Sequence, residues 1–108
     1  MPKFRVSVHG KDYKIGIVQR RFLFRKKHVW KQAGFYTTRF VESDNANEAI
    51  FQVFETLQME LERDGRTTEN SSLELEEIQE DDKGFELYAP GTGYTFYTGD
   101  EAQIKVTH

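Results

Sequence analysis

The densest group of chemically capable side chains lies between residues 20 and 31. This segment holds six Lys or Arg residues, no acidic residue, and interleaved apolar side chains including Phe22, Leu23 and Phe24. Cations bind phosphates and flat rings stack on bases, so this mixture suits single-stranded nucleic acid. The candidate interaction surface consists of six cations and one tryptophan: Arg20, Arg21, Arg25, Lys26, Lys27, Trp30 and Lys31.

A plainer interpretation of the same segment is a strand or hairpin with apolar residues inward and solvated cations outward. We favour it, because most charge runs are solvated faces and the protein as a whole is acidic, with a net charge of −3. The patch also has a second specific use, which is pairing with the acidic half of another subunit. We prefer that use over nucleic-acid binding.

The three histidines offer a separate route to chemistry. His9, His28 and His108 are the histidines of the chain, and none stands at a metal-ligand spacing from another histidine or from clustered carboxylates. If folding brought a carboxylate to His9 or His28, the pair could serve as an acid–base group in a small hydrolase-like or isomerase-like enzyme. The sequence cannot place such a pair, so we predict no catalytic residue.

An acidic cluster near residue 77 raises the question of a metal site. It lacks the spaced Asp/Asn-Gly loop of a calcium-binding hand, so we interpret it as the polar face of a strand. On such a strand Glu74 and Glu76 project to one side, while Leu73 and Leu75 project to the other. We therefore predict no metal and no cofactor. The cluster comprises Glu74, Glu76, Glu77, Glu80, Asp81 and Asp82.

A short glycine-containing loop, Gly91-Thr92-Gly93, weakly echoes a phosphate-binding loop. It has no third glycine, no following Lys-Ser/Thr, and no strand-to-helix context. We interpret it as a turn between two aromatic strands.

Charge is divided unevenly along the chain. Residues 1–41 hold 11 Lys or Arg and one acidic residue, a net of +10, whereas residues 42–108 hold 4 Lys or Arg and 17 acids, a net of −13. Such asymmetry indicates either an anionic partner for the first half or contact between the two halves.

The composition indicates the broad class of protein. The 108 residues suit one domain, and cysteine is absent, so we expect neither disulfides nor a cysteine-based zinc site. No apolar signal region or membrane span is evident, and we expect a cytoplasmic protein.

One helix and several strands are predicted from periodicity. Apolar residues recur at helical spacing from Ala46 to Leu61, with Asn45 placed to cap the start and Gly65 to end it. Strands are expected near residues 4–8, 35–41, 73–78, 85–88 and 94–97, with a possible edge strand at 104–106. Residues 15–32 suggest two short strands around a turn at Lys26–Lys27, or a short helix.

These elements predict a single compact α+β domain spanning residues 1–108. It would contain an antiparallel or mixed sheet of about four to five strands, with one long helix packed on one face. Both faces of residues 35–41 carry rings. We therefore expect the second sheet face to be covered, most simply by a homodimer.

Several stretches carry a family resemblance. They are Val8-His9-Gly10, the strand from Gly34 to Ser43 followed by a helix, and Pro90 to Tyr97. The chain resembles a family of small uncharacterised bacterial proteins, some encoded in integron mobile gene cassettes. The resemblance implies a compact cytoplasmic α+β protein and brings no activity with it. The segment from Lys14 to Gln32 departs most from that pattern.

The function predicted from these observations is binding rather than catalysis. We expect an interaction module, a homodimeric accessory protein with a polarised surface and a possible anionic partner. Nucleic acid is the less favoured partner, and no membrane contact is expected. The two alternatives are single-stranded nucleic-acid binding through residues 20–31 and a small enzyme with a His–carboxylate pocket.

Overall fold

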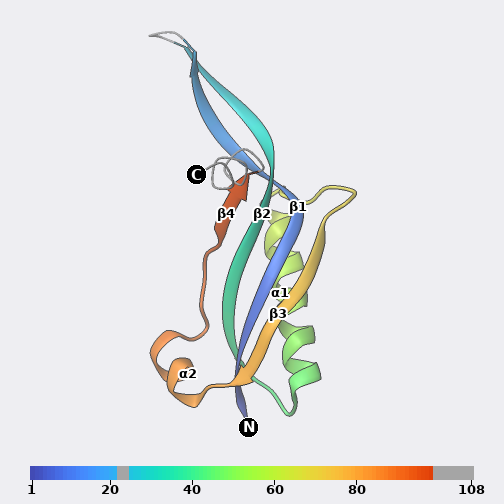
Figure 1. Cartoon of the computed structure of the whole chain (residues 1–108), viewed down its shortest axis with the longest axis vertical. Helices are drawn as coiled ribbons and strands as arrows, with labels where there is room; N and C mark the ends of the chain where they lie inside the picture. Colours follow the sequence, from blue (N-terminus) through green and yellow to red (C-terminus); the bar gives the residue numbers. More distant parts are fainter. Residues whose placement is uncertain (22–24, 99–108) are drawn as a thin grey trace, which may run out of the picture.

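The fold is an antiparallel sheet with a long helix against one face (Figure 1). The computed structural model describes residues 1–21 and 25–98. For residues 17–21 and 25–29 it describes the backbone and not the side chains. The strand order in the sheet is β3-β1-β2-β4, and each neighbouring pair is antiparallel. In chain order the elements are β1 (Lys3–Arg21), β2 (Arg25–Glu42), α1 (Ala46–Arg63), β3 (Ser72–Glu80), α2 (Asp82–Tyr88) and β4 (Thr95–Thr98). The predicted α+β class is confirmed.

Helix α1 begins and ends where its capping residues predict. The Asn45 side chain accepts a hydrogen bond of 2.9 Å from the backbone N–H of Glu48. At the other end Gly65 has a φ of +71°, and its N–H donates to the carbonyl of Glu62. The N–H of Arg66 donates to the carbonyl of Leu61, which completes a Schellman motif.

The core lies between α1 and the face of the sheet that it covers. The buried helix residues recur at every fourth position, so they form one stripe along α1. The sheet contributes alternate residues of β1, and Phe35 from β2 packs over Gly10, where a methyl group would overlap its ring. The central buried residues are Phe4, Val6, Val8, Phe35, Ala49, Val53, Leu57 and Leu61.

The second face of the sheet is covered at one end only among the described residues. There α2 packs on Phe40, which is buried, with the Tyr88 ring 6.2 Å from the Phe40 ring between centroids. Further along, the hydroxyls of Ser7 and Thr38 meet at 3.2 Å on an exposed surface. The expected aromatic cover is thus partly supplied by α2, and the homodimer remains a prediction.

Two sequence-based predictions of local structure are wrong. Residues 85–88, expected as a strand, belong to α2, because the Asp81 side chain accepts from the N–H of Gly84 and starts a helix there. A run of four residues is too short to separate strand from helix periodicity. The expected strand at 104–106 lies outside the described residues.

The turn expected at Lys26–Lys27 is also misplaced. Both residues lie within β2, where Lys26 pairs with Arg20 and Lys27 with Gln19. The connection between the strands falls between Arg21 and Arg25. The two short strands expected within residues 15–32 are continuations of the long strands β1 and β2, and the alternative of a short helix does not occur in the described part of this segment.

The long β1–β2 pair gives the molecule its elongated shape. Beyond the pair Tyr13–Ala33 the described parts of the two strands run on as a two-stranded ribbon, past the end of α1 (Figure 1). The radius of gyration is 16.5 Å, against about 13 Å for a compact chain of this length. Neither described helix is both long and apolar enough to span a lipid bilayer.

Candidate functional site

The predicted interaction surface lies on the projecting ribbon. We call residues 13–21 of β1 and 25–33 of β2 the basic ribbon; it contains seven cations and no acid. Its nine-residue strands extend about 30 Å at ordinary strand rise. Arg20 and Arg21 come from β1, while Arg25, Lys26, Lys27, Trp30 and Lys31 come from β2, so the fold brings all seven predicted residues to this ribbon.

Strand register places cations directly opposite one another near the ribbon's end. Arg20 pairs with Lys26, and Arg21 pairs with Arg25. Like charges in directly opposed positions repel and destabilise a strand pair.

Trp30 lies in the half of the basic ribbon that is nearer to the body, and its side chain is 58% exposed. It pairs with Gly16, and its ring lies beside that glycine because no side chain occupies the opposite position. The ammonium of Lys14 lies 5.2 Å from the centroid of the Trp30 ring. An exposed ring with a cation beside it can stack on a base and hold the adjoining phosphate.

A hollow of about 470 Å³ opens where the basic ribbon joins the body. Lys11, Asp12 and Gln32 line one part of it, and Tyr97 lines another. Gln32 donates a hydrogen bond to the Asp12 carboxylate. The remaining lining residues are Lys31, Ala33, Gly34 and Thr98.

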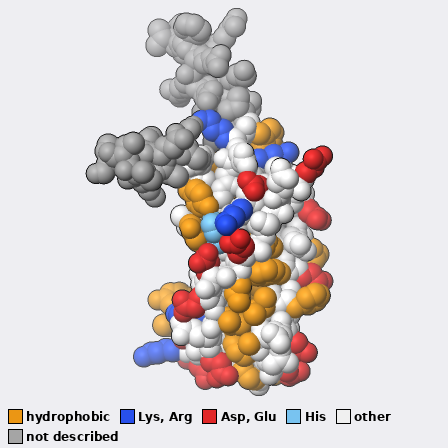
Figure 2. All heavy atoms as spheres, turned by 45° about the vertical axis from the view of Figure 1, so that its right-hand side comes forward, with side chains coloured by type: hydrophobic (Ala, Val, Ile, Leu, Met, Phe, Trp, Pro, Cys, Tyr) orange, Lys and Arg blue, Asp and Glu red, His pale blue; other side chains and the backbone are white. Residues whose placement is uncertain are grey.

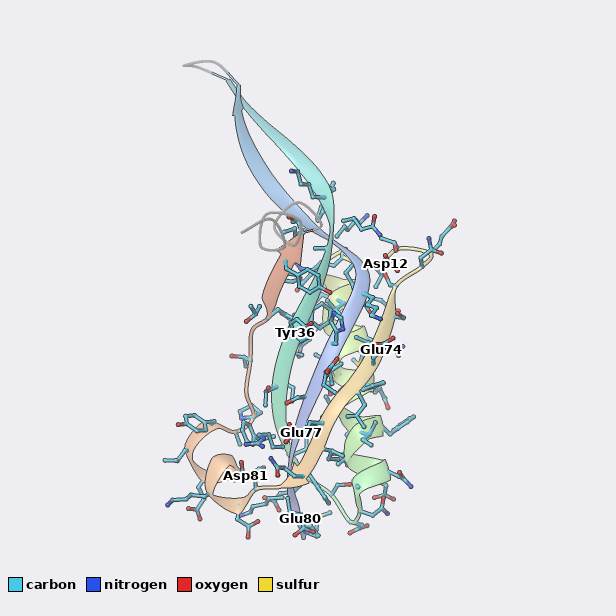
Figure 3. The ribbon with its side chains drawn as sticks, in the orientation of Figure 1. Asp12, Tyr36, Glu74, Glu77, Glu80 and Asp81 are labelled. Atoms are coloured by element: carbon cyan, nitrogen blue, oxygen red, sulfur yellow. The ribbon has the colours of Figure 1, made fainter. Side chains whose placement is uncertain are left out.

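Beside this hollow, four strands bring together a cluster around His9, one of the two histidines considered for a His–carboxylate pair. The His9 imidazole is 8% exposed and stacks on Tyr36, with centroids 4.4 Å apart and planes 11° from parallel. Its Nε2 is hydrogen-bonded to the hydroxyl of Tyr97. Its Nδ1 lies 3.6 Å from a carboxylate oxygen of Glu76. Tyr36 and Glu74 extend from β2 and β3, the strands on either side of β1 (Figure 3).

Electrostatics around His9 involve one further ion pair. The Lys11 ammonium lies 3.1 Å from Glu74, and that hydrogen bond raises the pKa of Lys11. Burial raises the pKa of Tyr97, with the nearby Tyr36 adding to the effect and the Lys11 charge opposing it. Tyr97 therefore stays a neutral phenol at ordinary pH and can exchange a hydrogen bond with the imidazole.

The sequence offered His9 as one member of a His–carboxylate pair but could not place its partner, because the members of the cluster are far apart along the chain. His9 and Glu76 meet only because β1 and β3 are neighbours in the sheet. A bulge also leaves Glu76 between the pairs Ser7–Glu77 and Val8–Leu75, so two consecutive glutamates lie toward one face. The available signal was a histidine on the polar face of β1 and acids on the polar face of β3, and it becomes informative only once the strand order is known.

Two other members of the acidic cluster, Glu77 and Asp81, are engaged in structure. Arg5 reaches Glu77 at 3.1 Å and Asp81 at 3.2 Å, and Asp81 also caps α2. The loop at Gly91–Gly93, with φ of +77° and +86° at its glycines, joins α2 to β4, so the prediction of a turn between two strands is wrong. The side chain of His28 and all of His108 lie outside the described residues, so the His–carboxylate hypothesis is addressed by His9 alone.

A buried ion pair fastens the sheet to α1 at a distance from both regions. Arg39 donates two hydrogen bonds to Glu60, at 2.9 and 3.2 Å, and the Tyr94 hydroxyl donates to the same carboxylate at 2.6 Å. The hydrogen bond from Arg39 lowers the pKa of Glu60, while burial and then the Glu60 carboxylate raise the pKa of Tyr94 to about 12. These groups satisfy one another and form a structural element.

No protein-family model, curated protein or solved structure matches this chain. The resemblance to integron-cassette proteins thus remains an expectation, and the candidate function depends on the geometry described above.

Proposed function

We propose that the protein binds single-stranded nucleic acid through the basic ribbon. The observation that carries the proposal is the pair of all-cationic cross-strand positions, Arg20–Lys26 and Arg21–Arg25, on a ribbon without an acid. Phosphates placed against these pairs would neutralise the repulsion and release counterions. The exposed Trp30 ring supports an unpaired strand as the ligand, because its face can stack only on a base outside a duplex.

The arrangement of charge supports this partner more strongly than the sequence did. Among the described residues the acidic side chains lie on the body (Figure 2). Three of them pair there with cations: Glu77 with Arg5, Glu74 with Lys11 and Glu60 with Arg39. The ribbon projects away from that body (Figure 1). A polyanion approaching the ribbon from its far end would therefore meet cations before it meets the acidic surface.

The test is fluorescence anisotropy with a labelled single-stranded 20-mer in low salt. Arg25→Glu combined with Lys27→Glu should weaken binding by at least about tenfold, because two phosphate contacts become repulsive. The matched control reverses two cations of the body, Arg63→Glu with Lys83→Glu, and should bind nearly as well as the wild type. With about four phosphate contacts, raising salt from about 50 to 200 mM should cost roughly 50-fold in affinity.

Three results would contradict the proposal. They are an absence of binding at low salt, equal weakening by the body control, and affinity independent of salt. A matching duplex is included because preference for the duplex would remove the role given to Trp30.

A second candidate is self-association, in which the basic ribbon of one copy meets the acidic β3 of another. Its support is the place of β3 at the edge of the sheet, with four glutamates along its length. Sedimentation velocity separates the candidates. In this case the ribbon double variant dissociates a wild-type dimer and the oligonucleotide does not bind.

A further inference from the structure

We propose that His9, Glu74 and Glu76 bind one zinc ion on the open face of the sheet. One ligand atom from each residue lies within 4.8 Å of the others, which is close enough for a small adjustment to bring all three around a single ion. The Nδ1 of His9 and an oxygen of Glu76 are already 3.6 Å apart. Ligand atoms of a tetrahedral zinc ion stand about 3.3 Å apart, given bonds of about 2.0 Å.

The His9 ring is held in the orientation that a metal ligand needs. It is buried, stacked on Tyr36 and hydrogen-bonded through Nε2 to Tyr97. Its Nδ1 faces the glutamates and makes no hydrogen bond to any described residue. A ligating histidine typically uses its second nitrogen for such an outer contact, which fixes the tautomer and the ring plane. Tyr97 is therefore a positioning residue for this site.

The nitrogen that faces the acids is the one that would bind the metal. For Nδ1 to act as a ligand, the proton must lie on Nε2, where it can donate to the Tyr97 hydroxyl. In that tautomer the Nδ1 lone pair points toward the Glu76 carboxylate, and a cation between the two acceptors would bind both.

Strand alternation places both glutamates on the open face. Glu74 pairs directly with His9, and Glu76, two residues further along β3, projects to the same side. The β-bulge at Glu76 lies between the pairs Ser7–Glu77 and Val8–Leu75, and bulges occur often beside functional sites.

Lys11 is the cation that currently occupies part of the site. It holds one oxygen of Glu74 at 3.1 Å, and both side chains are about half exposed. An exposed ion pair of this kind contributes little stability, so a divalent ion can displace it at small cost. Two carboxylates and a neutral imidazole then face the ion.

The ligand set selects among metals. One imidazole nitrogen with two carboxylate oxygens suits zinc, whereas magnesium and calcium prefer oxygen alone. Three protein ligands leave a fourth position for water or an external ligand. Because the Glu74 and Glu76 side chains are about half exposed, that position has an accessible approach from solvent.

Titration of the protein with zinc chloride, followed by calorimetry, tests the assignment. The wild type should bind one ion per chain, and Glu76→Gln should remove this binding. Glu77→Gln is the matched control, since the neighbouring glutamate faces Arg5 instead. Tyr97→Phe should weaken zinc affinity about 10- to 100-fold, as the loss of an outer-shell partner does. Millimolar magnesium should not compete.

Histidine-ring NMR locates the ion. Zinc should shift the Nδ1 resonance of His9 and leave its Nε2 protonated, while His28→Gln should bind zinc normally. Thermal unfolding of Glu76→Gln shows whether the fold is intact, and we expect it to be, because this side chain is 46% exposed.

The proposal is overturned if zinc does not bind one to one, if it binds at His28 or His108, or if Glu76→Gln and Glu77→Gln bind alike. The Arg25→Glu/Lys27→Glu variant should bind zinc as the wild type does, so this result is independent of nucleic-acid binding.

Discussion

Individual ion pairs in this protein differ greatly in burial, and burial decides what each contributes. Arg5–Glu77 and Lys11–Glu74 are exposed enough for solvent to screen them. The Arg39 side chain, in contrast, is only 7% exposed where it meets Glu60. With Tyr94, this pair joins β2, α1 and the segment that precedes β4. We therefore expect it to dominate the polar contribution to stability.

Glu60→Gln should lower the free energy of unfolding by about 2 kcal/mol at pH 7, because it removes the charge from hydrogen bonds to a buried guanidinium. Because folding lowers the pKa of Glu60, its carboxylate stabilises the fold above its ordinary pKa of 4.5, and the effect is lost as pH falls through the lower folded value. The difference between variant and wild type should shrink accordingly. Urea unfolding at several pH values measures this.

The control for that experiment is Glu62→Gln, which removes an exposed acid from the same helix. It should change the free energy of unfolding by no more than about 0.5 kcal/mol. An equal effect of the two variants, or a Glu60→Gln effect independent of pH, would show that the buried pair contributes no special stability.

The sequence predicts an element well when the residues that determine it lie within a few positions of one another. The limits of α1 follow from Asn45, the apolar stripe and Gly65, all of which act within a few residues. The full length of the β1–β2 strand pair was only partly predicted, since the pair joins residues up to 39 positions apart in the sequence. The His9 cluster depends on strand order, which leaves no mark in a short window of sequence. Helix α2 was missed because its cap lies just outside the four residues first considered.

The capping of α1 gives a prediction at the level of this element. Asn45→Ala should destabilise the protein by about 1 kcal/mol, because the N–H of Glu48 loses its acceptor. Asn47→Ala is the matched control within the first turn, where an exposed alanine is a better helix former and should be neutral or slightly stabilising. Chemical denaturation of both variants provides the comparison. If both variants lose equal stability, the capping argument fails.

The whole molecule divides into a body and a ribbon that are proposed to do different things. The body contains the core, the buried Arg39–Glu60 pair and the His9 cluster, whereas the ribbon carries cations in opposed positions. The pairing of β1 with β3 ends at Lys11, and the pairing of β2 with β4 begins at Ala33. In the described part of the chain, neither edge strand pairs with the ribbon beyond those points. The body should therefore fold without the outer ribbon.

Replacing residues 16–30 with Asn-Gly tests this division directly. Ile15 pairs with Lys31, so a two-residue turn can close the shortened hairpin without changing the register of the body. The shortened protein should keep its helical circular dichroism, unfold cooperatively and bind zinc one to one, yet lose the labelled oligonucleotide. Retained oligonucleotide binding would place that activity on the body. Loss of cooperative unfolding would show that the ribbon is part of the folding unit, and the Arg25→Glu/Lys27→Glu variant would then separate the two activities in the intact chain.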